Sequence, residues 1–172
     1  MKRRQVLRGA AAMAALGPAA CRARRPSDPI PHHDLLWLES AVLGERRTVA
    51  VWQPDVDPSV ALPVLYMPDG GIREDFPHVA NTLAMLISDG VLPPMRLVGI
   101  ENTDRQRDLT GPTQVPKDRE MLPSGGGSAA FRSCVRDELI PHIQSRSACD
   151  NHRAVMGEGL AGRFAVETLF RG

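Results

Sequence analysis

The chain has 172 residues, of which 21 are Lys or Arg and 20 are Asp or Glu, and 42% are hydrophobic. This composition is typical of a globular protein, and the length fits one domain. A formal net charge of +1 and an aromatic content of 4% argue against a nucleic-acid partner. Such a partner needs a basic face and stacking side chains.

The first 21 residues, MKRRQVLRGAAAMAALGPAAC, have the parts of an export signal. A basic head precedes an Ala-rich apolar stretch that is too short to span a bilayer and ends in small residues. The pair Arg3-Arg4 in RRQVL resembles a twin-arginine signal, and PAAC resembles a lipoprotein cleavage box with Cys21 as the lipidated residue. We therefore expect an exported protein, periplasmic or attached to the membrane through Cys21. The alternative is a disordered basic tail on a cytoplasmic protein.

The segments after the signal are predicted from their apolar patterns and turn residues. Residues 22–33 are proline-rich and are expected to form an extended linker. Strands are expected in two runs within 34–54 and at 63–71, 95–101 and 152–157, and helices at 76–90, at 128–144 and from 160 onward. Pro141 should kink the second helix. The polar segment 102–127 has no periodicity and is expected to be a long loop.

Strands alternate with helices from residue 63 onward, and this order favours a mostly parallel sheet with helices on both faces. The first two strands are joined by the turn LGER and should form an antiparallel edge. The fold class is therefore α/β, with one domain over residues 34–172.

The stretch VMGEGLAGRF, residues 155–164, allows two interpretations. Gly157, Gly159 and Gly162 spell G-x-G-x-x-G, the phosphate-binding turn of a dinucleotide site. That site needs a further strand and an acidic residue about 20 positions on, and neither follows here. The same residues also fit the strand, sharp turn and helix of a serine hydrolase, G-x-S-x-G, with glycine in place of the nucleophile. The second interpretation is favoured.

The segment from about 40 to 170 resembles the esterase family of α/β-hydrolases that includes enterochelin (siderophore) esterases and S-formylglutathione hydrolase. Five stretches carry the resemblance in order: GERRTVAVWQP, LPVLYMPDGG, GVLPPMRLVGIENTDRQRDLTGP, GGGSAAFRSCVRDELIPHI and RAVMGEGLAGRFAVETLF. The last is similar to a pattern of the form G-[HE]-S-L-[GA]-G. The resemblance implies the N-terminal part of an α/β-hydrolase fold and a carboxylic-ester hydrolase that needs no cofactor.

By this resemblance, Gly159 occupies the position of the nucleophilic Ser. The backbone N–H of Leu160 would be one oxyanion donor, and the loop at Gly70 and Gly71 would supply the other. The family's triad acid and His lie beyond the nucleophile helix, whereas this sequence ends at Gly172. We therefore expect a C-terminally incomplete domain that lacks all three catalytic side chains.

Several polar residues near these motifs have alternative interpretations. Arg105, Arg107 and Asp108 could line a polar substrate pocket, or they could form an internal ion pair that fixes a long loop. The loop at Asp69 could be part of the oxyanion hole or a simple turn. Glu158, beside the empty nucleophile position, could be a surrogate nucleophile or base, but we interpret it as pointing away from the pocket.

The histidines and cysteines do not form an evident site in the sequence. No pair of histidines has metal-ligand spacing, no metal site is expected, and each is interpreted as a surface residue: His32, His33, His78, His142 and His152. Cys134 lies on a predicted helix and Cys149 in the loop after it. Although export permits a disulfide, two separate thiols are expected.

These observations lead to three hypotheses about function. The first is an exported esterase-family α/β-hydrolase that is catalytically inactive. The second is a non-catalytic exported protein that uses the former ester pocket to bind a small-molecule ester or a siderophore-like ligand. The third, least favoured, is an active enzyme with an unusual mechanism.

Overall fold

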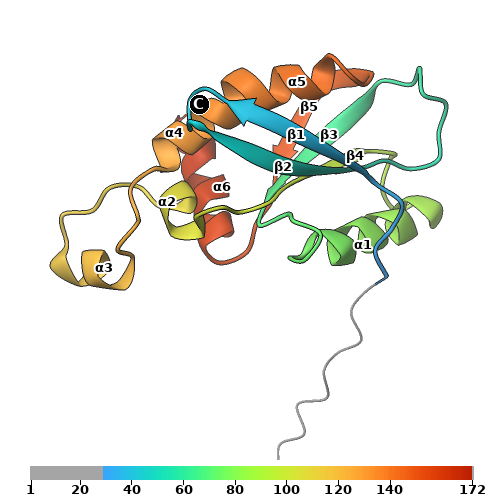
Figure 1. Ribbon diagram of the computed structural model, residues 1–172. Coiled ribbons are helices and arrows are strands. Elements are labelled where there is room, and N and C mark those ends of the chain that lie inside the picture. Colours follow the sequence, from blue (N-terminus) through green and yellow to red (C-terminus); the bar gives the residue numbers. More distant parts are fainter. Residues whose placement is uncertain (1–28, 172) are drawn as a thin grey trace, which may run out of the picture.

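The part of the chain described by the computed structural model, residues 29–171, begins with a hairpin (Figure 1). β1 (Asp34–Ser40) and β2 (Glu45–Trp52) pair antiparallel, as the sequence predicted. The turn between them holds Gly44 at φ +67°, a conformation that costs glycine little. The predicted export signal, its lipidation site Cys21 and residues 22–28 of the predicted linker lie outside the described residues.

Three further strands complete the sheet of the described residues: β3 (Leu62–Pro68), β4 (Arg96–Ile100) and β5 (Cys149–Val155). The strand order is β1-β2-β4-β3-β5. β3 runs parallel to both β4 and β5, and β2 joins β4 antiparallel. This confirms the predicted mostly parallel sheet with antiparallel first strands.

Helices cover both faces of the sheet (Figure 1). α1 (Phe76–Ser88) packs on one face through Phe76, Ala80 and Leu83. The other face carries a helical run, α4 (Ser128–Ser133), η1 (Cys134–Leu139) and α5 (Ile140–Gln144), together with α6 (Leu160–Arg171). Side chains along each strand alternate between the two faces, so that successive residues pack into one or the other of two hydrophobic cores. Within residues 29–171, no helix has the length and apolar character needed to cross a membrane.

The predicted helix at 128–144 is present, but its centre is wider than an α-helix. Residues Cys134–Leu139 form a π-helical turn that ends two residues before Pro141. Proline has no N–H to donate, and its ring clashes with the carbonyl four residues back in an α-helix. The π-helical turn therefore lies where the proline would otherwise disturb a regular helix.

The segment 102–127, expected to be a loop, contains two short helices. α2 (Arg105–Leu109) is capped by Asp104, whose carboxylate accepts a hydrogen bond from the Arg107 N–H at 3.0 Å. The Leu109 side chain is fully buried in the core. α3 (Pro116–Met121) has no buried residue. The predicted long loop is thus interrupted by two helices, which are too short to show a periodicity in the sequence.

Candidate active site

A sharp turn joins the end of β5 to the start of α6. Gly159 in this turn has φ +58°, and α6 begins at the next residue, Leu160. The Met156 N–H donates to the carbonyl of Tyr66 at 3.0 Å and ties the turn to β3. A strand, a residue with positive φ and a helix, in this order, make the nucleophile elbow of an α/β-hydrolase.

The glycines on either side of Gly159 allow α6 to approach the turn closely. A Cβ at Gly157 would lie 2.5 Å from the carbonyl carbon of Ala161, and one at Gly162 would lie 2.9 Å from the carbonyl oxygen of Gly157. A Cβ at Gly159 would meet only Arg105, whose Nη2 lies 3.8 Å away. The G-x-G-x-x-G spacing is therefore explained by packing, and the space for a nucleophile side chain is open.

The loop after β3 does not present the oxyanion donors that the sequence predicted. The Gly70 N–H donates to the carbonyl of Ile100 at 3.0 Å, because the loop lies tightly against β4. The Gly71 N–H donates to Oε2 of Glu74 at 2.7 Å. Both donors are thus bound within the fold, which corrects the prediction for this loop. The Leu160 N–H has no acceptor among the backbone hydrogen bonds of residues 29–171.

Arg105 comes from α2 and lies next to the elbow. Its guanidinium makes a bidentate pair with Asp69, with Nε 2.9 Å from Oδ1 and Nη2 2.7 Å from Oδ2. The hydrogen bond to Asp69 raises the pKa of Arg105, so the guanidinium stays protonated. The side-chain amide of Asn102 donates to both Asp69 and Glu74 and so helps to hold Asp69 in place. The Arg105 side chain remains 45% exposed, so it is accessible to a ligand at Gly159.

Arg107 and Asp108 belong to a different cluster, on the β2 side of α2. Asp108 is 1% exposed and pairs with Arg47, which is also 1% exposed, at 2.7 Å. Arg107 bridges Asp108 at 2.8 Å and Glu45 at 2.7 Å. This is the internal ion pair that the sequence offered as the alternative. Asp108 has no surface for a substrate, so its prediction as a binding residue is corrected by its burial.

A hollow of about 750 Å³ opens between the elbow and α1, and its lining includes Asp69, His78 and Glu158. Glu158 is exposed and belongs to the lining of this hollow, and the direction expected for its side chain stays a prediction. His142 lies on α5, before β5 begins, and is therefore at the opposite end of that strand from the elbow. Within residues 29–171, no group of three or more His, Cys, Asp or Glu side chains is arranged to hold a metal ion.

The two cysteines of the described part are free thiols. Cys134 is buried in η1, and burial raises its pKa to about 11. Cys149 begins β5 and accepts a hydrogen bond from Nη1 of Arg96 at 3.0 Å. Cys149 lies at the opposite end of β5 from the elbow, and Cys134 is buried in the core, so neither thiol is exposed at the elbow as a substitute nucleophile.

Several solved structures of similar fold are described as hydrolases or esterases. An IroE-like serine hydrolase from Shewanella oneidensis is 28% identical with a TM-score of 0.72, covering 80% of this chain and 46% of that protein. The siderophore hydrolase EstB from Aspergillus nidulans is 22% identical with a TM-score of 0.67, covering 83% and 52%. The enterobactin esterase FES from Shigella flexneri, solved in the presence of 2,3-dihydroxy-N-benzoyl-glycine, is 20% identical with a TM-score of 0.57, covering 84% and 34%.

The chain thus spans about half, or less, of the length of these structures. No curated protein matches it. The family model described as Putative esterase matches residues 40–171, which include strands β2 to β5, the elbow and the nucleophile helix. The chain belongs to this esterase family of α/β-hydrolases.

Proposed function

We propose that this protein is an esterase-family α/β-hydrolase that does not itself hydrolyse carboxylic esters. The observation that supports the proposal is Gly159, which stands in the elbow at φ +58° and supplies no nucleophilic atom. Covalent ester hydrolysis needs an activated side-chain nucleophile at this point. In a well-characterised serine hydrolase, removal of the nucleophile alone lowers kcat by about 10⁶-fold.

The oxyanion site gives further support. A tetrahedral intermediate needs preorganised N–H donors, and the loss of one donor lowers kcat by roughly 10²- to 10³-fold. The N–H groups of Gly70 and Gly71 are already bound, to Ile100 and Glu74. Of the three predicted oxyanion donors, only the Leu160 N–H would then be available to a ligand carbonyl at the elbow. Ground-state binding is therefore favoured over turnover.

The test is hydrolysis of p-nitrophenyl acetate by the purified full chain, with the Shewanella relative as the active control. We expect a rate equal to that of buffer with the same concentration of an inert protein. Glu158→Gln should leave this rate unchanged. A stoichiometric burst, or a turnover that Glu158→Gln abolishes, would show that the chain is an enzyme and that Glu158 is its surrogate nucleophile or base.

A second candidate function, ligand binding without turnover, is favoured by the hollow at the elbow and the guanidinium beside it. Arg105 is held rigid by Asp69 yet is accessible, and the hollow has a volume of about 750 Å³. Arg105 does not line the hollow itself, but its partner Asp69 does. An accessible cation this close to the hollow suits an ester that carries an anionic or catecholate group, as siderophores do. We therefore propose a siderophore-like ester as its ligand class.

Calorimetric titration with 2,3-dihydroxy-N-benzoyl-glycine tests this candidate. Arg105→Gln should weaken binding at least tenfold, whereas Arg73→Gln, at an exposed arginine of the neighbouring loop, should not. Absence of binding at millimolar ligand, or an equal effect of both substitutions, would reject the elbow as a binding site for this class.

We also propose that the protein is exported. The support is the sequence of residues 1–21, with Arg3-Arg4 in the basic head and Cys21 at the cleavage box. A fusion of residues 1–30 to a reporter that works only outside the cytoplasm should give signal. Changing Arg3 and Arg4 together to Lys should reduce it, and Cys21→Ser should release the protein from the membrane fraction. An unchanged signal in the Lys variant would reject the twin-arginine route.

A further inference from the structure

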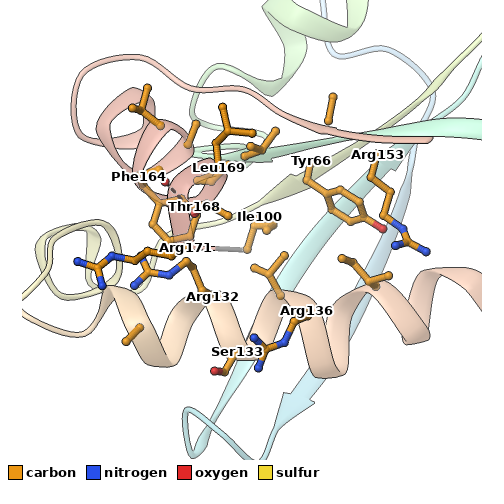
Figure 2. A pocket seen from close by; sticks show the side chains of 18 residues that line it. Tyr66, Ile100, Arg132, Ser133, Arg136, Arg153, Phe164, Thr168, Leu169 and Arg171 are labelled. Atoms are coloured by element: carbon orange, nitrogen blue, oxygen red, sulfur yellow. Dashed lines mark hydrogen bonds between the residues drawn. The ribbon is translucent and has the colours of Figure 1, made fainter. Parts of the chain in front are cut away.

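The two edges of the described sheet differ in what lies next to them. At one edge, β5 borders a groove of about 720 Å³ between α6 and the α4–η1 run (Figure 2). At the other edge, β1 carries an exposed face whose neighbours all come from the first two thirds of the chain. Three strands separate this face from β5 and from the last described residues.

The exposed face, here called the β1 face, lies on one side of β1 and consists of Leu35, Trp37 and Glu39. The residues between them, Leu36 and Leu38, point the other way and pack in the core under the α4–η1 run. Leu35 pairs with Ala50, which belongs to the core under α1, so the β1 face is on the α1 side of the sheet. Among the described residues, that core includes β2, β3 and β4 but no residue of β1. The β1 face is therefore left uncovered.

Trp37 is the more unusual residue of this face. The chain has two tryptophans; Trp52 is 7% exposed, whereas Trp37 is 63% exposed. Thr48, which pairs with Trp37, lines a hollow of about 220 Å³ that Leu35 and Ile72 also line. Tryptophan has an apolar ring and a polar N–H, and it is enriched where one side is apolar and the other is wet.

The start of the described chain is held on the same side of the sheet. The Pro29 carbonyl accepts a hydrogen bond from Nδ2 of Asn81 on α1 at 2.8 Å, and the ring of His33 lies 5.7 Å from that of Phe76. Pro29 is eight positions after Cys21, and eight extended residues span at most roughly 26–29 Å. A domain of this size is about 35–40 Å across. An anchor at Cys21 therefore keeps the α1 side of the domain toward the bilayer.

The charges near this tether suit an anionic membrane surface. Residues 22–25, directly after Cys21, are RARR, and basic residues next to a membrane anchor are attracted by anionic headgroups. On the β1 face, Glu39 pairs with Arg46. Glu101 lines the small hollow together with Arg73. These four charges balance, so the face does not repel an anionic bilayer.

The size of the β1 face favours a bilayer over a second copy of the chain. Each partner in a stable protein interface buries about 800 Å². An aromatic side chain buries about 150–250 Å², so Leu35 and Trp37 together provide well under the area that a dimer needs. A bilayer contact has no such requirement, because the anchor at Cys21 already holds the domain at the surface.

We propose that the β1 face rests on the bilayer to which Cys21 anchors the chain, with the Trp37 ring at the level of the lipid headgroups. This inference rests on the proposed lipid anchor. The ring takes the position that interfacial tryptophans occupy in membrane proteins, and Leu35 adds apolar contact beside it. Such a contact is a second signal that supplements a lipid anchor, since a single acyl chain gives only marginal membrane binding.

Chemical anchoring tests this contact independently of lipidation in the cell. Cys21 of the purified full chain is coupled to maleimide headgroups in vesicles of phosphatidylethanolamine and phosphatidylglycerol. Cys149→Ser in this protein leaves Cys134, which is buried, as the only other thiol. Compared with the same chain blocked by N-ethylmaleimide without vesicles, tryptophan emission should move to shorter wavelength. Acrylamide quenching should fall about twofold, because an interfacial tryptophan lies within the headgroup layer.

Three variants assign the signal to the β1 face. Trp37→Phe should abolish the shift, because Trp52 is buried. Leu35→Ser should reduce the shift, whereas Val60→Ser should not. Val60 is a matched control, since it is 46% exposed against 42% for Leu35 and lies in the loop between β2 and β3. Equal Tm values of the Leu35 and Val60 variants show that the difference is not a loss of folding.

Each contrary result has one meaning. A coupled chain whose emission and quenching equal those of the blocked chain overturns the β1-face contact and leaves the anchor untouched. A dimer of the blocked chain in sedimentation equilibrium that Trp37→Phe or Leu35→Ser dissociates overturns it in favour of a second copy. Failure of the anchor itself is seen separately, as a Cys21→Ser protein that fractionates in cells like the unchanged chain.

Discussion

Restoring serine at the elbow tests the geometry and the chemistry of this site separately. In Gly159→Ser the new Cβ enters open space, with Arg105 Nη2 as its nearest neighbour at 3.8 Å, but φ is +58°. A left-handed backbone costs a non-glycine residue roughly 1–2 kcal/mol. Serine also reduces the conformational entropy of the unfolded chain relative to glycine, and this effect offsets about 0.4–1 kcal/mol of the cost. We therefore expect a net loss of about 1 kcal/mol, or roughly 2–4 °C in Tm.

Two other glycines provide matched controls for urea unfolding. Gly44→Ser has φ +67° and nothing within 4 Å of its Cβ, so its cost should equal that of Gly159→Ser. Gly157→Ser places a Cβ 2.5 Å from the Ala161 backbone and forces α6 to move, at about 2–3 kcal/mol. A loss at Gly159 that matches Gly157 rather than Gly44 would refute the open elbow.

The same Gly159→Ser protein should remain inactive toward p-nitrophenyl acetate. A serine hydroxyl needs an adjacent base within about 2.6–3.2 Å, and the histidine that lines the neighbouring hollow, His78, sits on α1 across that hollow. Substantial hydrolysis would mean that a base is in place. His78→Ala in the Gly159→Ser background would then identify it, with His142→Ala, at the far end of β5, as the control.

The buried ion pairs around α2 give two predictions about stability. Asp108→Asn leaves the buried Arg47 cation short of a partner and should lower the free energy of unfolding by about 3 kcal/mol. Asp137→Asn, in an exposed pair, should leave the urea midpoint unchanged, and equal effects would contradict the burial argument. The hydrogen bond from Arg107 lowers the pKa of Glu45 below its ordinary value of 4.5. Its stabilisation is therefore full above about pH 4.5 and is lost as pH falls through the folded pKa. Glu45→Gln should flatten the stability curve between pH 5 and 3, and parallel curves would refute this linkage.

The backbone of the elbow could be predicted from the sequence, whereas its hydrogen bonds could not. Gly157, Gly159 and Gly162 mark positions where a side chain would clash or be strained. These constraints arise between residues close together in the chain, so the glycine spacing in the sequence reveals them. The acceptors of the Gly70 and Gly71 N–H groups are Ile100 and Glu74. One of these lies on a neighbouring strand, and its position depends on the register of β3 against β4.

The two arginines of RQRDL, residues 105–109, are a second case in which the sequence could not predict the contacts of a side chain. In the sequence they are equivalent, and both were candidates for a substrate pocket. In the structure α2 directs them to opposite sides, with Arg105 on Asp69 and Arg107 on Glu45. Residues two positions apart on a helix do not share a face. The helix itself was missed because it is too short for a periodic pattern, so the roles of the two arginines could not be separated.

Glycine at the elbow also changes the balance between stability and activity. In a serine hydrolase, the nucleophile is held in a sparsely populated backbone region at a cost of about 1–3 kcal/mol, which the surrounding fold must offset. Gly159 adopts φ +58° without that strain. Under the proposed function, glycine at this position stabilises the chain at no catalytic cost, as expected where a strained site trades stability against activity. The glycine that supplies no nucleophilic side chain is thus also the residue that best suits the φ of this turn.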